Sequence, residues 1–87
     1  MIEKTSGGLR LTGPMLIANA RALLEAGRGF LRTADPRAEC VLDLSAATET
    51  DSSALSVVFG LMRSARERGL SMRLINPPSS MISQAAL

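Results

Sequence analysis

The feature of this sequence that most constrains its fold is the alternation of short apolar runs with longer amphipathic segments along 87 residues. Apolar residues recur every three or four positions in residues 16–31 and 54–65, which predicts two helices with one apolar face each. Short apolar or alternating runs at residues 9–12, 40–44 and 71–75 predict strands. Because strand–helix–strand connections are right-handed and place their strands parallel, the alternation predicts an α/β fold.

Glycine and proline mark several boundaries in the first half of the chain. Ile2–Thr5 can form an additional strand that pairs with the next one across the hairpin turn Ser6-Gly7-Gly8. Pro14 suits the first turn of the first helix, where its missing N–H costs nothing. Gly27 and Gly29 each weaken that helix by up to about 1 kcal/mol relative to alanine.

The second half of the chain is divided in the same way. Asp35-Pro36 ends the first helix, residues 46–51 are expected to form a loop, and Gly69 ends the second helix. Asn76-Pro77-Pro78 ends the last strand, and Ser79-Ser80 can cap a third helix. The resulting order is β-β-α-β-α-β-α, with a mostly parallel four-stranded sheet covered by helices.

The strand at residues 40–44 is short and apolar, which predicts a central strand buried on both faces. Asp43 interrupts it and must find hydrogen-bond donors or an edge position, since a buried carboxylate without partners is costly. Cys40 is the one cysteine of the chain, so we expect a reduced, buried thiol rather than a disulfide.

Composition excludes most enzyme chemistry. The chain has no His, no Trp and no Tyr, with one Cys and two Phe. It therefore lacks a histidine general base, a Ser-His or Cys-His nucleophile pair and an imidazole metal ligand. Two aromatic residues cannot build a stacking platform for single-stranded nucleic acid, and the net charge of +2 is mild. We expect no enzyme activity, no cofactor, no metal and no nucleic-acid partner.

Two weaker alternatives arise from charge and glycine patterns. A small nucleotide-binding protein is disfavoured because no Walker-type glycine-rich loop exists and Lys4 is the only lysine. Arg63, Arg66 and Arg68 could bind phosphate, but solvated charges near a helix carboxyl terminus are the favoured interpretation.

The amino terminus lacks a signal-peptide pattern, and no apolar run reaches the roughly 18–20 residues that cross a bilayer. We therefore expect a cytoplasmic location.

The segment Asp51-Ser52-Ser53 opens the second helix and is the most informative part of the sequence. Ser52 or Ser53 is expected to cap the helix, because a side-chain oxygen there can accept a free backbone N–H. A phosphate on Ser52 would meet the positive helix end and unpaired donors, although Asp51 would repel it unless it points away. Capping is favoured by chemistry alone, and a modified or partner-contacting serine is the alternative.

The chain resembles the STAS domain from Leu9 to Leu87. The segments that carry the resemblance are Val41-Leu42-Asp43-Leu44-Ser45, Asp51-Ser52-Ser53-Ala54-Leu55, Arg66-Glu67-Arg68-Gly69 and Asn76-Pro77-Pro78. Within that family it is similar to the STAS subunit of the Mla lipid-asymmetry ABC transporter, through Leu11-Thr12-Gly13-Pro14, Leu23-Leu24-Glu25-Ala26-Gly27 and the Asp51–Leu55 segment. The family often has glycine where this chain has Ala54, so the turn must already be helical there.

The resemblance implies that residues 1–87 form a single STAS domain, with a C-terminal helix trimmed relative to family members. It implies a non-catalytic subunit that binds and regulates the ATPase of a bacterial phospholipid (Mla-type) ABC transporter and supports outer-membrane lipid asymmetry. Such a subunit is cytoplasmic and peripheral at the inner membrane through its complex. The expected partner-binding or phosphorylation residues are Ser52, Asp51, Ser53, Ser56, Val57 and Gly60.

Two points stay open. Val57 and Phe59 lie off the main apolar face of the second helix, so they either form an exposed partner surface or pack under neighbouring elements. The alternative function is that of an anti-sigma-factor antagonist, in which an anti-sigma-factor kinase phosphorylates Ser52 and the phosphate weakens partner binding.

Overall fold

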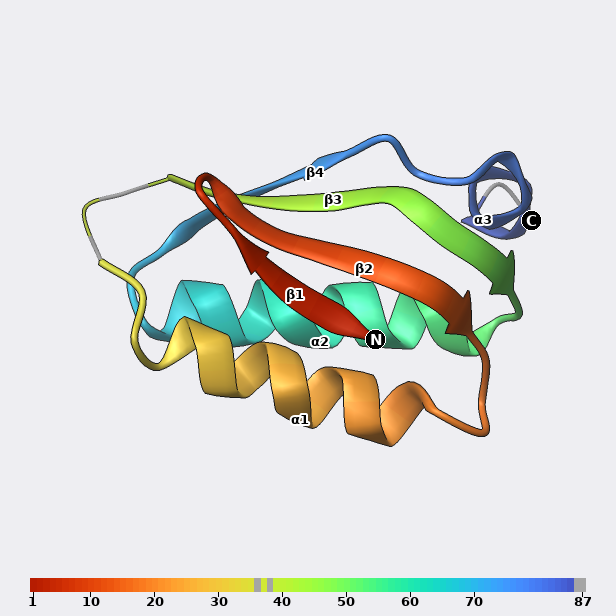
Figure 1. Ribbon diagram of the computed structural model, residues 1–87, viewed down its shortest axis with the longest axis horizontal. Coiled ribbons are helices and arrows are strands. Elements are labelled where there is room, and N and C mark those ends of the chain that lie inside the picture. The colour runs from red at the N-terminus through yellow and green to blue at the C-terminus, as the bar shows by residue number, and fades with distance from the viewer. Residues whose placement is uncertain (36, 38, 86–87) are drawn as a thin grey trace.

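The computed structural model describes residues 1–35, 37 and 39–85 (Figure 1). In chain order the elements are β1 (Ile2–Thr5), β2 (Gly8–Met15), α1 (Ala20–Leu31), β3 (Glu39–Thr50), α2 (Ser53–Glu67), β4 (Ser71–Ile75) and α3 (Ser79–Ala85). This order confirms the predicted β-β-α-β-α-β-α arrangement. Among the described residues, none of the helices combines the length and the apolar character that a membrane crossing requires.

The four strands form one sheet in the order β1-β2-β3-β4. β1 pairs with β2 as an antiparallel hairpin, whereas β2, β3 and β4 are parallel neighbours. The register places Leu9 beside Leu42 and Leu42 beside Leu74, so apolar side chains from three strands point to the same face. The predicted mostly parallel sheet is therefore confirmed.

Both long helices, α1 and α2, lie side by side on one face of this sheet (Figure 1). Cys40, Leu42 and Leu44 point toward that face and are at most 7% exposed, while Val41 and Asp43 alternate with them and are half-buried. The expectation that this strand is buried on both faces is wrong. The strand order explains why: both crossovers advance in the same direction, and right-handed connections then place both helices on the same side.

The core lies between the sheet and the two long helices. Its members that are less than 2% exposed and largest in volume are Leu11, Met15, Leu31, Leu42, Leu44, Val58 and Leu61. These are inward-facing strand residues and the inner stripes of the helices, as the sequence periodicity predicts. Cys40 is free and buried, as expected, and burial raises the pKa of its thiol.

The first helix begins six residues later than predicted. Pro14 lies within β2, and α1 starts at Ala20. Asn19 closes the intervening turn: its Oδ1 accepts the Leu16 N–H at 2.8 Å, and its Nδ2 donates to the Pro14 carbonyl at 2.8 Å. The side-chain bridge of Asn19 satisfies backbone groups that a helix would otherwise satisfy, so the chain can remain extended through Pro14.

The prediction of a loop at residues 46–51 is wrong for residues 46–50, because β3 continues to Thr50, and only Asp51 of that range lies outside the strand. The longer β2 provides the partner: Thr12 lies beside Ala46, and Met15 lies beside Thr50, with two register shifts between the strands. Polar and small residues thus form strand where a neighbouring strand offers hydrogen bonds, whatever their own preference. The extension brings the end of β3 directly to the start of α2 (Figure 1).

Candidate functional site

Asp51 joins the end of β3 to the start of α2. Its Oδ1 accepts the N–H of Ser53 at 2.8 Å, and its Oδ2 accepts the N–H of Ile17 at 3.0 Å. Its own N–H donates to the Met15 carbonyl at 3.3 Å. The bonds from Ile17 and then Ser53 hold the pKa of the Asp51 carboxyl below its ordinary value, since they stabilise the charged form. Asp51 therefore connects the turn before α1 with the first turn of α2.

Ser52 occupies the N-cap position of α2, but its side chain makes no capping hydrogen bond. Its backbone is already helical, at φ −61° and ψ −20°, whereas a capping serine normally adopts an extended conformation that turns its hydroxyl back toward the helix. The carboxylate of Asp51 performs the capping instead. The prediction of a serine cap is therefore wrong, and the exposed Ser52 hydroxyl makes no hydrogen bond to the part of the chain that the structure describes.

The first-turn N–H groups beside Ser52 are partly occupied. The Ser53 N–H is bonded to the Asp51 carboxylate, and the Ala54 N–H is bonded to the Asp51 carbonyl at 3.0 Å. The sequence predicts unpaired donors here for a phosphate on Ser52, and two of those donors are already used. Ala54 is helical and fully buried, in agreement with the expectation that the turn is helical at this position.

The other predicted site residues are divided between surface and core. Ser56 is exposed one turn after Ser52, and Ser53 is half-buried. Val57 is 2% exposed and lies in the core, so it contributes nothing to a surface, contrary to the prediction. Gly60 is half-buried against α1, where an added Cβ would lie 2.8 Å from Cδ1 of Leu24, so its lack of a side chain allows the two helices to pack closely.

Two exposed apolar residues complete the surface around Ser52. Phe59 is 59% exposed and follows Ser56 by three residues on the outer side of α2, so exposure decides the alternative left open by the sequence. Ile17 is 78% exposed and is held beside the helix start by its bond to Asp51. Sequence reasoning missed Ile17 because the first helix was expected to begin at Pro14, although Ile17 does fall outside the apolar spacing of that helix.

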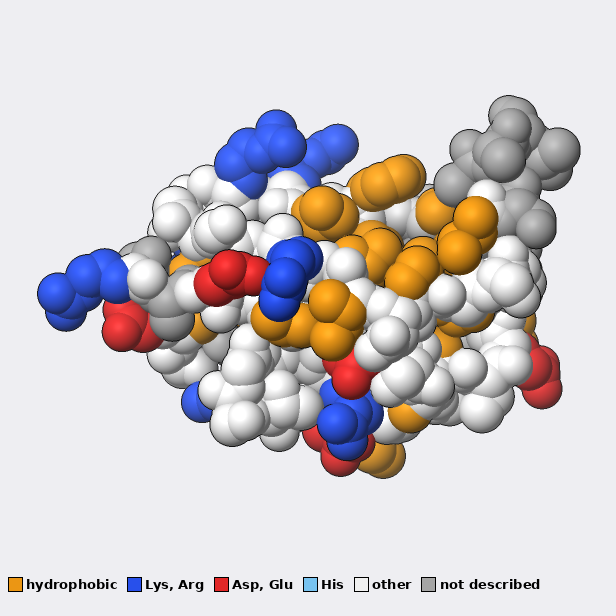
Figure 2. Space-filling model, turned by 90° about the horizontal axis from the view of Figure 1, so that it is seen from above, with side chains coloured by type: hydrophobic (Ala, Val, Ile, Leu, Met, Phe, Trp, Pro, Cys, Tyr) orange, Lys and Arg blue, Asp and Glu red, His pale blue; other side chains and the backbone are white. Residues whose placement is uncertain are grey.

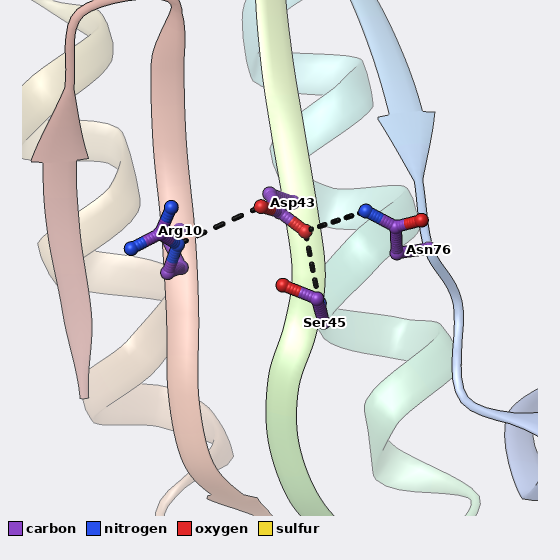
Figure 3. Close-up of polar contacts among 4 residues, drawn as sticks. All are labelled: Arg10, Asp43, Ser45 and Asn76. Atoms are coloured by element: carbon purple, nitrogen blue, oxygen red, sulfur yellow. Dashed lines mark hydrogen bonds and ion pairs between the residues drawn. The ribbon is translucent and has the colours of Figure 1, made fainter.

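A second polar cluster lies on the open face of the sheet (Figure 3). Oδ1 of Asp43 accepts the Ser45 N–H at 2.9 Å and Nδ2 of Asn76 at 3.2 Å, and Oδ2 lies 3.6 Å from Nε of Arg10. The bond from Ser45, followed by that from Asn76, holds the pKa of the Asp43 carboxyl below its ordinary value. The expectation that Asp43 requires donors is confirmed.

The carboxylates of these two clusters act as hydrogen-bond acceptors for neighbouring N–H groups. Both carboxylates are ionised and hold backbone or amide donors, and a carboxylate whose pKa is lowered is a poor base near neutral pH. Within residues 1–35, 37 and 39–85, no group of three or more His, Cys, Asp or Glu side chains could hold a metal ion.

Comparison with solved structures gives the same fold. The unphosphorylated form of the anti-sigma factor antagonist SpoIIAA superposes with a TM-score of 0.69 at 18% identity, covering 97% of this chain and 78% of that chain. Two crystal structures of Mglu, one of them its native form, give TM-scores of 0.61 at 19% and 16% identity. They cover 88% and 90% of this chain but only 19% and 23% of the Mglu chains.

No curated protein matches the sequence. A family model does: STAS_2, described as "Mlab, STAS domain", matches residues 2–87. The match extends over the β1–β2 hairpin, both crossovers and the Asp51-Ser52-Ser53 segment. The chain therefore belongs to the STAS_2 family of STAS domains.

Proposed function

We propose that this chain is a non-catalytic STAS subunit that binds and regulates the ATPase of a bacterial phospholipid ABC transporter of the Mla type. The observation that carries the proposal is the Ser52 hydroxyl, which is exposed at a fixed helix start and makes no hydrogen bond within the described chain. The family description, which names Mlab, supports the assignment to this type of transporter. In this proposal residues 1–87 act as one STAS domain held at the inner membrane by its partner.

The surroundings of Ser52 suit a docking surface. Asp51 fixes the position of Ser52 through two backbone hydrogen bonds, so a partner meets a preorganised contact. Ser56 and Phe59 continue the same exposed stripe of α2, and Ile17 projects from the neighbouring turn. Exposed apolar side chains bordered by polar ones are typical of protein–protein interaction sites.

Co-purification with the candidate ATPase tests the proposal. The wild-type chain and Ser52→Ala are expected to co-elute with the ATPase, because alanine preserves the shape of the contact. Ser52→Glu is expected to abolish co-elution, since it places a charge in a desolvated contact. ATPase turnover is measured on the same complexes and should fall with Ser52→Glu.

Ser6→Glu provides the matched control. Ser6 is exposed in the β1–β2 turn, at the opposite end of the sheet from the start of α2 (Figure 1). This variant adds the same charge and should co-elute like the wild type. The proposal is contradicted if neither the wild type nor Ser52→Ala binds the ATPase, or if Ser6→Glu disrupts binding as strongly as Ser52→Glu.

A second candidate function is that of an anti-sigma-factor antagonist switched by phosphorylation of Ser52. An exposed serine hydroxyl without a hydrogen-bond partner among the described residues is accessible to a kinase, and the similar fold of SpoIIAA belongs to a protein named as such an antagonist. The occupied N–H groups of Ser53 and Ala54 leave less to stabilise a phosphate there, which favours the first proposal. Mass spectrometry after incubation with a cognate kinase decides: an unmodified Ser52 would argue against the switch.

A further inference from the structure

An apolar groove of about 320 Å³ runs along α2, between that helix and the segment from β4 to α3. Leu55, Phe59 and Met62 of α2 form one wall, Leu74 and Pro77 form the other, and Ile82 of α3 contributes at one end. Figure 2, which shows the molecule from above the view of Figure 1, has hydrophobic side chains gathered in one region of that surface. Every described residue that lines the groove is apolar.

Two residues of the groove are exposed, so no described part of the chain packs over them. Phe59 and Ile82 are 59% and 55% exposed, and they are two of the four large hydrophobic side chains that the described residues leave exposed. A continuous apolar surface of this kind is a recognised feature of interaction sites in soluble domains.

Charge defines one end of the groove. Leu55, Phe59, Met62 and Arg66 follow each other at spacings of three or four along one stripe of α2, and Arg63 flanks that stripe. Both arginines are exposed, and neither forms an ion pair with an acidic group that the structure describes. A complementary ligand is therefore apolar over the groove and negatively charged beyond Met62.

The length of the groove matches a helix. From Leu55 to Met62 the α2 wall of the groove spans two helical turns, about 10 Å at 1.5 Å per residue. A helix that binds in a groove presents apolar residues at i, i+3 or i+4, and i+7, which cover the same distance. We propose that this groove binds an amphipathic helix of the partner, with two apolar turns followed by acidic residues that face Arg63 and Arg66.

This inference rests on the proposed function, since it assigns the docking element of the same partner. It adds a contact separate from Ser52, which lies at the amino end of the same stripe. A second copy of this chain fits less well, because the described residues that line its own groove include no acidic side chain to face the arginines. An extended segment pairing with the exposed edge of β4 would bind through backbone groups and would not need Phe59.

Binding of a synthetic helix tests the groove directly. The probe is a fluorescein-labelled model peptide of about four turns, with leucines at i, i+3, i+4 and i+7 followed by glutamates, measured by anisotropy. The wild type should bind it, and Phe59→Ser and the double variant Arg63→Gln/Arg66→Gln should each bind at least about tenfold more weakly. The same peptide with lysines in place of the glutamates should not bind.

A matched charge control uses α1. Arg21→Gln/Arg32→Gln removes the same two charges from exposed positions outside the groove and should leave probe binding unchanged. Phe59 is more than half exposed, so Phe59→Ser should keep the wild-type melting profile, which circular dichroism checks. The proposal is overturned if the wild type binds neither peptide, if both peptides bind equally, or if Phe59→Ser has no effect.

Co-purification with the ATPase separates this inference from the proposed function. Ile17→Ser and Ser52→Glu should disrupt co-elution while leaving probe binding intact, because both residues lie outside the groove. Absence of an ATPase complex contradicts the proposed function. In that case the binding of the model peptide still tests whether the groove accepts an acidic amphipathic helix. The groove assignment is overturned if the ATPase complex tolerates both Phe59→Ser and Arg63→Gln/Arg66→Gln. It is also overturned if sedimentation velocity shows that the chain forms a dimer and that Phe59→Ser abolishes this dimer.

Discussion

The carboxylate of Asp51 has the function that the sequence assigns to a serine. It caps α2 and connects the helix start to the turn at Ile17, which leaves Ser52 available at the surface. At the scale of single residues, position 51 is therefore structural and position 52 is open to function. The division is testable, because removing the Asp51 side chain should destabilise the fold whereas removing the Ser52 hydroxyl should not.

Asp51→Ala should lower Tm by several degrees, because it leaves the N–H groups of Ser53 and Ile17 without their acceptor. Ser52→Ala should change the free energy of unfolding by no more than about 0.5 kcal/mol, since an exposed hydroxyl without a hydrogen bond is removed. Thermal unfolding followed by circular dichroism measures both. If Ser52→Ala melts at as low a temperature as Asp51→Ala, the Ser52 side chain does contribute to capping α2, contrary to this prediction.

Acid should destabilise the fold through Asp43 and Asp51. The pKa of each carboxyl is lower in the folded chain than its ordinary value of about 3.9, so the folded state binds fewer protons than the unfolded state in this range. Their contribution to stability is present above the ordinary value and is lost as pH falls through the lower folded-state pKa.

Urea unfolding at pH 7 and at pH 3 measures the acid effect. The wild type should lose stability between these values, and Asp51→Asn should lose less, because one of the two carboxylates no longer titrates. Equal losses for the two proteins would show that Asp51 does not contribute to the acid response.

At the scale of elements, α1 and α2 approach each other through a reciprocal pair of glycines. Gly27 of α1 accommodates Leu61 of α2, and Gly60 of α2 accommodates Leu24 of α1. The sequence treats Gly27 and Gly29 alike as weak points of α1. The structure separates them, because a Cβ at Gly27 would lie 2.4 Å from Cδ2 of Leu61, whereas a Cβ at Gly29 would meet nothing within 4 Å.

Gly27→Ala should therefore destabilise the chain although alanine is the better helix former. Leu61 is fully buried and cannot move without repacking the core, at a cost of about 1–3 kcal/mol, which exceeds a helix-propensity gain of about 1 kcal/mol. Gly29→Ala should stabilise by about 0.5–1 kcal/mol, because it receives that gain without the clash. Urea unfolding of both variants measures the contrast, and stabilisation by Gly27→Ala would contradict the close packing.

At the scale of the whole molecule, the one-sided sheet leaves a polar face that holds the last part of the chain in place. Asp43 at the centre of the sheet binds Asn76, which has a left-handed φ of 54° at the end of β4. The hydroxyls of Thr50 and Ser80 lie 2.6 Å apart and join the end of β3 to α3. These contacts position α3, and with it the Ile82 end of the apolar groove.

Asp43→Ala should loosen this connection. Amide hydrogen exchange is expected to accelerate at Asn76 and at residues 79–82, because Asn76 loses its side-chain partner in a conformation that few residues adopt. Arg10→Gln is the control: its partly exposed ion pair with Asp43 is long, at 3.6 Å, and should matter little. Faster exchange confined to β1 and β2, or equal effects of both variants, would contradict the link between the sheet centre and α3.

The order of elements could be predicted from the sequence because its signals are local. Helical and strand periodicities, and breaks such as Asn76-Pro77-Pro78, depend on neighbours a few residues away. The right-handed crossover rule then converts that order into a mostly parallel sheet. The position of Ser52 at a helix start follows from the same local pattern, as does the need of Asp43 for donors.

Other features are decided only by tertiary structure, because they depend on which segments meet. β3 extends to Thr50 because β2 lies beside it, and Asp51 joins the start of α2 to a distant turn because Ile17 is within reach of its carboxylate. Val57 and Phe59 look alike in sequence, yet one is buried and the other exposed. Burial is a property of what packs against a side chain, and the identity of that neighbour is not encoded within a few residues of it.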